Sequence, residues 1–490
     1  MDNAATDRQF RKNLNLFDST AIVVGSMIGS GIFIVTTDMS LVLGAPGWVL
    51  LAWLITGLMT IIAAVSYGEL AAMMPNAGGQ YVYIREAYNP LTAFLYGWTL
   101  FLVIQGGSIA AIAMAFGKFT GVLYPWFSES HILADLGIIK INSVHVIAII
   151  SILFLSYINS KGIRIGKIVQ NTFTYSKTLA LGIFILAGIF FLKNTEVIRL
   201  NTEIFWDATT NVEGLEGPVS GFSLLIVLGV SLVGALFTYD AWYNITFTGA
   251  EVINPKRNIP LGLFLGTLLV TIIYLLVNIV YIIALPMRGN PEGTTVIEQG
   301  IQYATDSRLG TAAMQGLLGD RASLVMAILV MVSTFGANNG IILSGARVYY
   351  AMAKDNLFFK QVGILNRFNV PGKGLLVQCV WACLLCLSGT YNNLLDYVVF
   401  SVLIFYSLTV LAVMVMRIRK PHIERPYKAF GYPYLQILYL VAAVFIMLVL
   451  LIYKPDYTWP GLIIVFLGVP VYYGRRVWQR RMGKNYTNEL

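Results

Sequence analysis

Long apolar runs, separated by short charged segments, dominate the chain. A helix needs about 20 mostly apolar residues to cross the hydrocarbon core of a bilayer. These runs are continuous, whereas the strands of a membrane β-barrel alternate apolar with polar residues. Twelve such runs occur, at Ser19–Thr37, Ala45–Gly68, Ala87–Gly117, Ile141–Ser160, Ile168–Leu192, Pro218–Ala250, Ile259–Met287, Ala322–Ala346, Gly374–Leu395, Tyr397–Met416, Ala429–Tyr453 and Tyr457–Gly474. The pattern predicts an all-α membrane protein with twelve transmembrane helices.

The lysine and arginine residues between these runs are unevenly distributed. If the N-terminus is cytoplasmic, the inside segments carry 24 of them and the outside segments carry 8. Cytoplasmic loops of membrane proteins carry such an excess, and a wrong number of helices would scramble it. We therefore predict that both termini are cytoplasmic. The lack of an organelle-targeting signal favours a bacterial inner membrane.

The composition agrees with a membrane environment. Of the 490 residues, 57% are hydrophobic and only 12% are charged, whereas about a quarter of the residues in soluble proteins are charged. The net charge of +9 is spread between the apolar runs, which argues against nucleic-acid binding. The polar stretch before Leu14 is no cleavable signal peptide. We expect a single transmembrane domain over residues 1–490.

Two of the runs are interrupted. The first has glycines at positions 25, 29 and 31 with serines between them, and each glycine weakens a helix by about 1 kcal/mol relative to alanine. The sixth contains a polar and aromatic stretch, 234–244, with Asp240 in its middle. Taken alone, the small residues of the first run are equally consistent with close packing between helices.

The two interruptions correspond if the chain contains inverted repeats. Runs one to five would form the first repeat, about 16–192, and runs six to ten the second, about 218–416, followed by two extra helices over about 429–474. Interrupted helices in matching positions indicate a transporter binding site. A broken helix exposes free N–H and free C=O groups, and an amino acid, with its carboxylate and its ammonium group, needs both.

Several motifs along the chain resemble those of one transporter family. They are Val24–Phe33, Tyr67–Leu70, Gly78–Tyr83, Phe237–Trp242, Glu251–Pro260, Ser344–Arg347 and Arg425–Lys428. The chain thereby resembles the amino acid–polyamine–organocation superfamily over nearly its whole length, and within it the L-type amino acid transporter group with its bacterial relatives. The resemblance implies a leucine-transporter-like fold with helices one and six broken. It also implies sodium-independent exchange of neutral amino acids by alternating access.

The resemblance further implies a substrate site at the first interruption. The substrate carboxylate would accept hydrogen bonds from backbone N–H groups around Ser30, Gly31 and Ile32. Carbonyl groups near Met27 and Ile28, together with one from the sixth helix, would hold the substrate ammonium group.

The sixth helix would complete this site. By the same resemblance, Phe237 supplies a carbonyl for the ammonium group and closes over the substrate as an outer gate, while Trp242 and Tyr243 shape the side-chain pocket. Three interpretations stay open for Asp240. It would cap the second half of the helix, handle a proton, or contact the substrate amine.

Lys177 is a single basic residue within the fifth run. It follows Ile168 by nine positions, which places it roughly 14 Å into a helix, and charges at such depth are functional by default. A structural lysine bonded to carbonyls is the alternative. The resemblance implies that its ammonium replaces a sodium ion, reaching carbonyls of the first helix and Ser333 or Thr334. This argues against sodium coupling, whereas proton transfer by a deprotonated lysine stays open.

The cysteines indicate neither a metal nor a covalent partner. Cys379, Cys383 and Cys386 share one apolar run without histidine or acid beside them, so we expect packing, no metal and no cofactor. Animal members of the group pair with a heavy chain through a disulfide after helix three. The corresponding loop, Tyr124–Lys140, has no cysteine, so we expect no disulfide-linked heavy chain.

Two other functions are alternatives to amino acid exchange. A proton-coupled symporter for amino acids or polyamines is the first, but a polyamine pocket needs several acids, and Asp240 is the only acid well inside a run. A membrane-embedded enzyme is the second, but catalysis needs clustered side chains, and His131, His145 and His422 are scattered. The sequence therefore favours a transporter of neutral amino acids, bound only by substrate and lipid.

Overall fold

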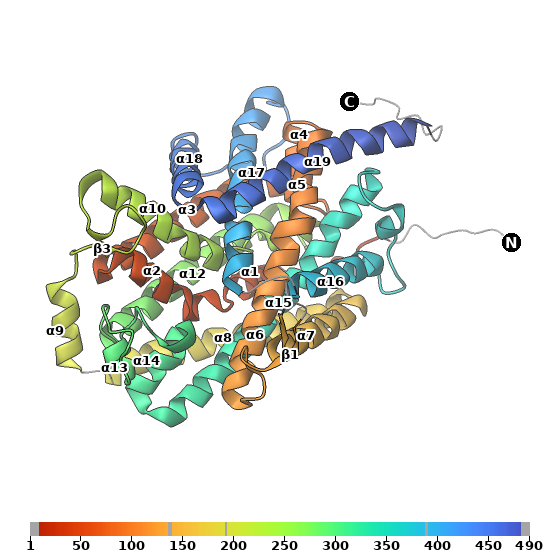
Figure 1. Cartoon of the computed structure of the whole chain (residues 1–490). Helices are drawn as coiled ribbons and strands as arrows, with labels where there is room; N and C mark the ends of the chain where they lie inside the picture. The colour runs from red at the N-terminus through yellow and green to blue at the C-terminus, as the bar shows by residue number, and fades with distance from the viewer. Residues whose placement is uncertain (1–8, 136–139, 192–193, 388–390, 482–490) are drawn as a thin grey trace.

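Long helices account for most of the computed structural model, which describes residues 9–135, 140–191, 194–387 and 391–481 (Figure 1). Within this part of the chain, nine helices are long and apolar enough to cross a membrane. They are α3 (Pro46–Met73), α5 with α6 (Pro90–Thr99 and Gln105–Leu123, joined by a π turn), α7 (Ser143–Ser160), α8 (Ile163–Phe191), α10 (Gly221–Thr238), α12 (Pro255–Ala284), α15 (Asp320–Lys354), α17 (Tyr391–Arg419) and α18 (Tyr434–Tyr453).

The three remaining predicted spans are also helical. The first is divided into α1 (Leu16–Met27) and α2 (Val35–Leu43), the ninth is the shorter α16 (Gly372–Cys386), and the twelfth is α19 (Pro455–Arg481). The predicted all-α membrane fold, with its first and sixth helices broken, is therefore confirmed.

One predicted boundary is wrong. The ninth span was expected to continue to Leu395, but α16 ends at Cys386 and α17 begins at Tyr391. The stretch at this boundary, Ser388–Asn393, is polar and contains Gly389, so the sequence carried a helix-stop signal that the predicted span passed over. The predicted end of the first repeat, residue 192, lies outside the described residues, and the repeat boundaries stay a prediction.

Short elements connect the long helices. The helical ones are α4 (Gln80–Ala87), α9 (Thr195–Glu203), α11 (Asn244–Phe247), α13 (Val296–Gln299) and α14 (Leu309–Leu318). Two small hairpins, β1 (Ile132–Asp135) with β2 (Lys140–Asn142) and β3 (Thr209–Thr210) with β4 (Gly217–Pro218), are antiparallel. Figure 1 shows α1 in the centre of the molecule, where it packs against α8, α12 and α15. The first half of the broken first helix is thus enclosed by unbroken helices.

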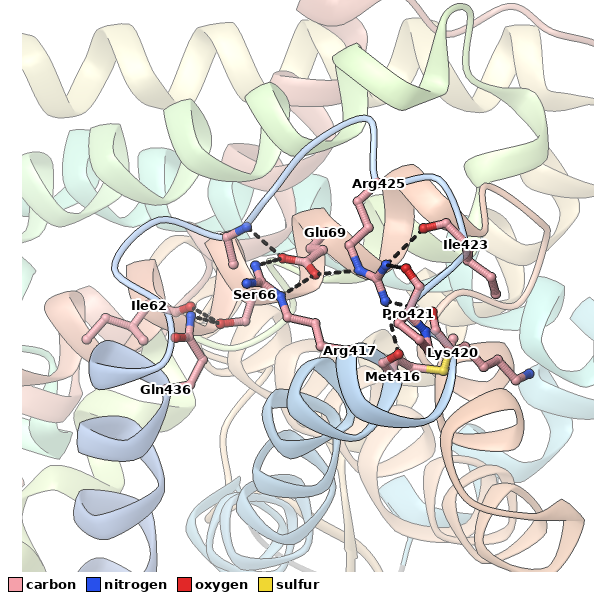
Figure 2. Close-up of polar contacts among 11 residues, drawn as sticks. Ile62, Ser66, Glu69, Met416, Arg417, Lys420, Pro421, Ile423, Arg425 and Gln436 are labelled. Atoms are coloured by element: carbon pink, nitrogen blue, oxygen red, sulfur yellow. Dashed lines mark hydrogen bonds and ion pairs between the residues drawn. The ribbon is translucent and has the colours of Figure 1, made fainter.

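One buried carboxylate ties α3 to α17 and to the segment that precedes α18 (Figure 2). Arg417 donates to both oxygens of Glu69, at 2.9 and 2.7 Å, and Arg425 lies 3.5 Å away. The backbone N–H of Ala429 donates to the same carboxylate at 2.7 Å. Since Glu69 is 1% exposed, these donors compensate a charge that would otherwise be costly to bury.

Further hydrogen bonds continue this junction. Arg425 donates to the carbonyls of Met416 and Lys420 at the end of α17, at 3.0 and 2.9 Å. One turn before Glu69, Gln436 of α18 donates to the Ser66 hydroxyl at 3.1 Å (Figure 2). The end of α17 is thereby fixed to α3, which matters because Tyr406 of α17 bonds Asp240 at the second helix break.

Replacing Glu69 with alanine should destabilise the protein by about 3 kcal/mol, because two arginines would lose their buried counter-charge. The melting temperature of the purified protein in detergent measures this. Glu196→Ala on α9 is the matched control, since Glu196 forms an exposed pair with Arg199 of the kind that contributes little. Equal melting temperatures for the two variants would contradict the assigned role of Glu69.

Candidate substrate site

The first interruption begins where α1 ends at Met27. The next residue, Ile28, has an extended backbone conformation, and a single 3-10 turn follows at Gly31–Phe33. The first hydrogen bond of that turn runs from the Phe33 N–H to the Ser30 carbonyl. The N–H groups of Gly31 and Ile32 therefore precede it, at a helix start that favours an anion.

Lys177 closes the other side of this interruption. Its side chain is fully buried, and its Nζ donates to the carbonyls of Gly25 at 2.6 Å, Ile28 at 2.5 Å and Ser333 at 3.4 Å. The Ser333 hydroxyl donates to the carbonyls of Ile28 at 3.1 Å and Gly29 at 3.2 Å. A cation and a hydroxyl thus satisfy the carbonyl groups that the broken helix leaves free.

Two predicted contacts differ from this arrangement. The Ile28 carbonyl already accepts from Lys177 and Ser333, and a carbonyl has two lone pairs, so it is not available to a substrate ammonium group. The Thr334 hydroxyl donates within its own helix, to Val330 and Met331. It therefore does not hold the lysine, whereas Ser333 does.

The second interruption lies at the end of α10, after Thr238. Ala241 has a φ of +67°, a left-handed conformation that is uncommon for a residue with a side chain. The Tyr406 hydroxyl of α17 donates to the Asp240 carboxylate. The short helix α11 begins after Tyr243 and has no side-chain cap, whereas the Asp240 carboxylate also accepts from the backbone N–H of Ala241, so the three interpretations of Asp240 stay predictions.

A small cavity lies between the two interruptions. Of the predicted site residues, Met27, Ser30, Gly31, Phe237 and Asp240 line it. A second small cavity adjoins Phe237 and Asp240 on the side of α17 and is otherwise lined mainly by valines and leucines. Phe237 and Asp240 thus stand between the two spaces.

Four of the residues predicted to contact the substrate do not line the central cavity. The Ile28 carbonyl accepts from Lys177 and Ser333, and the carbonyl of Ile32 accepts from the Tyr281 hydroxyl at 3.1 Å. Trp242 packs edge-on against Tyr67, with ring centres 4.6 Å apart, and Tyr243 packs against Trp242. The two aromatic rings therefore form a buried layer behind Asp240 instead of a wall of the pocket, because the left-handed turn directs the chain away from it.

Sequence reasoning missed two residues that join the interruptions. Tyr406 bonds Asp240, and the Tyr274 hydroxyl of α12 donates to the carbonyls of Met27 at 2.9 Å and Thr238 at 3.1 Å. Both are tyrosines inside ordinary apolar runs. The chain has 27 tyrosines, so residue type alone could not single out either of them.

Contacts close the molecule at the N-terminal end of α1. The N–H groups of Asn13 and Leu14 donate to the Glu251 carbonyl at 2.9 and 3.0 Å. Arg347 of α15 pairs with the Glu251 carboxylate at 2.8 Å, and both side chains are 1% exposed. A buried ion pair therefore joins α15 to the turn after α11 at this end of the molecule.

An integral membrane transporter is the class that this fold and these paired broken helices define. Residues 14–472 match the family model described as amino acid permease. The human b(0,+)-type amino acid transporter 1 is 29% identical over 98% of this chain and 92% of its own length. The mouse large neutral amino acids transporter small subunit 2 is 30% identical over 96% of this chain and 82% of its own. The chain therefore belongs to the amino acid permease family, which confirms the predicted resemblance.

Replacing Gly31 with valine should abolish transport while the protein still reaches the membrane. A Cβ at Gly31 would lie 2.8 and 2.9 Å from carbon atoms of Thr238, in the cradle between the interruptions. Gly182→Val on α8 is the matched control, because a Cβ at Gly182 would meet nothing within 4 Å. Uptake of a labelled amino acid by membrane vesicles measures both. Normal uptake by Gly31→Val would contradict the assignment of the substrate carboxylate to this position.

Proposed function

We propose that the protein exchanges neutral amino acids across the cell membrane without sodium, by alternating access. The observation that carries this proposal is the position of Lys177. Its ammonium contacts three carbonyl groups from α1, its broken end and α15, which is the kind of oxygen cluster that would otherwise bind a small cation. A permanently tethered charge leaves no reason to recruit sodium.

The cavity suits the two charged groups of an amino acid. The carboxylate would bind the N–H groups at the start of the turn Gly31–Phe33, where the partial charge is positive. The ammonium group would face the carboxylate of Asp240 and the carbonyl end of α1 at Met27. A single acid balances one ammonium group, so substrates with an uncharged side chain are favoured over polyamines.

Alternating access requires that the two ends of the cavity open in turn. In this conformation the buried pair of Glu251 and Arg347 closes the end near the N-terminus, which we assign to the cytoplasmic side because of the predicted charge distribution. Phe237 borders the cavity and would act as the gate towards the other side. Opening the inner end requires the segment that carries Glu251 to move relative to α15.

The site needs no covalently attached partner. The three cysteines, Cys379, Cys383 and Cys386, all lie in α16 and are free, and the sequence has no others. One relative is named as a small subunit. For this chain we propose that no disulfide-linked heavy chain is required, and that both termini lie in the cytoplasm of a bacterial cell.

Lys177→Ala should slow exchange sharply while expression is retained. The carbonyl groups of Gly25 and Ile28 would lose a donor, at about 1–3 kcal/mol for each unsatisfied buried group. Uptake into proteoliposomes loaded with an unlabelled amino acid measures the rate, with sodium replaced by choline in a parallel series. The native protein should be indifferent to this replacement. Strict sodium dependence of the native protein would refute the assignment of Lys177.

Phe237→Ala should reduce the rate of exchange, because the substrate would no longer be occluded. Phe222→Ala is the matched control on the same helix, since Phe222 is 69% exposed at the surface that would face lipid. The ratio of the two exchange rates in the same proteoliposome assay tests the gate. Unchanged rate and affinity in Phe237→Ala would exclude α10 from the substrate site.

A further inference from the structure

Two buried serine hydroxyls of the central cavity have no hydrogen-bond partner in the described part of the chain. Ser26 of α1 and Ser108 of α6 both line the cavity, and they are 3% and 4% exposed. Leaving a buried hydroxyl without a partner is costly. Such a cost at a cavity wall is offset when a ligand supplies the missing hydrogen bond.

Other polar side chains around the cavity are already engaged. The Thr238 hydroxyl donates to the Gly234 carbonyl at 2.8 Å, and Asp240 accepts from Tyr406. The carboxylate cradle at Gly31 and the acid at Asp240 serve the two charged groups that every amino acid shares. Ser108 comes from α6, which supplies neither the cradle nor the acid, so its hydroxyl remains for the part of the substrate that varies. Ser26 lies one turn before the cradle on α1.

The wall that carries Ser108 is held rigidly. On α6, Gln105 donates to the Ile341 carbonyl of α15 at 2.6 Å, and Asn338 of α15 donates to the Ile109 carbonyl at 3.3 Å. These contacts flank Ser108 on both sides, and residues three apart on a helix share a face. The hydroxyl is therefore held at a fixed place before any substrate arrives.

Ser26 approaches the same region from α1. A Cβ at Gly340 would lie 2.5 Å from the Ser26 Oγ, so the absence of a side chain at Gly340 allows α1 and α15 to meet here. Ile112 and Ile341 provide the apolar part of this end of the cavity. A small side chain that carries both a methyl and a hydroxyl group matches such mixed walls.

We propose that Ser108, supported by Ser26, hydrogen-bonds the side chain of the substrate, so that the transporter prefers hydroxyl-bearing neutral amino acids over apolar ones of equal shape. This inference rests on the proposed function. Threonine and valine are the sharpest pair of probes because they differ by a hydroxyl in place of a methyl group. A site with an unpaired polar group discriminates such a pair far better than an apolar pocket does.

The experiment measures inhibition of labelled amino acid exchange by threonine and by valine in proteoliposomes. The native protein should bind threonine about ten-fold more tightly, the effect of one net hydrogen bond. Ser108→Ala should reduce this ratio to about one, and Ser26→Ala should reduce it in part. Ser151→Ala is the matched control, because Ser151 is equally buried but donates to the Ala148 carbonyl at 2.7 Å. It should leave the ratio unchanged.

The possible failures are distinguishable. If the native protein exchanges amino acids without preferring threonine, the inference is wrong and the proposed function stands. If Ser108→Ala weakens threonine and valine equally, the hydroxyl contacts the shared charged groups or is structural, and the inference is again wrong. If no amino acid is exchanged by the native protein, the proposed function itself fails. Should Ser108→Ala not reach the membrane, the ratio in Ser26→Ala decides.

Discussion

The ammonium group of Lys177 and the carbonyl groups of the broken first helix form the contact on which the site depends. A helix that stops inside a membrane leaves carbonyl groups that water cannot satisfy. Lys177 and Ser333 supply donors to Gly25, Ile28 and Gly29. With these carbonyls satisfied, the chain can remain extended at Ile28 and present the N–H groups of the following turn to the cavity.

A comparable constraint applies to the sixth helix. Its break places Asp240 against Tyr406 of α17, and Tyr274 of α12 donates to carbonyl groups at both breaks. Three turns further along α17, Arg417 is held by Glu69 of α3. The wall of the cavity is thus connected, through one helix, to a charged junction at the end of the molecule. Contacts from the unbroken helices α12 and α17 thus fix the positions of the two helix breaks.

The sequence revealed the features that are expensive in a membrane. Glycines and serines in the first run, an acid in the sixth and Lys177 in the fifth all conflict with an apolar helix, so each stands out, and the structure places all three around one centre. Trp242 and Tyr243 were predicted to shape the substrate pocket, but an aromatic residue beside a helix break is equally consistent with a buried core. The direction of the chain after the left-handed Ala241 decides between them, and no sequence pattern encodes that direction.

The partners of the site were the least visible in the sequence. Tyr406, Tyr274 and Ser108 each contribute one hydroxyl group within a mainly apolar helix. The role of each hydroxyl depends on contacts that form only when distant helices pack together. Gly31 is different, because glycine at a break indicates a close approach, and its neighbour in space is Thr238. A functional residue can be predicted from the sequence when it conflicts with an apolar transmembrane helix. A functional residue that fits such a helix can be identified only from the folded structure.

The central claim is that Lys177 acts as a fixed cation and carries no proton through the transport cycle. Proteoliposomes that contain a pH-sensitive dye and a neutral amino acid test this directly, when exchange is followed by radioactivity in the same sample. We expect full exchange, and we expect addition of the amino acid to leave the pH inside the proteoliposomes unchanged. Movement of one proton with each amino acid, lost when Lys177 is replaced by alanine, would contradict it.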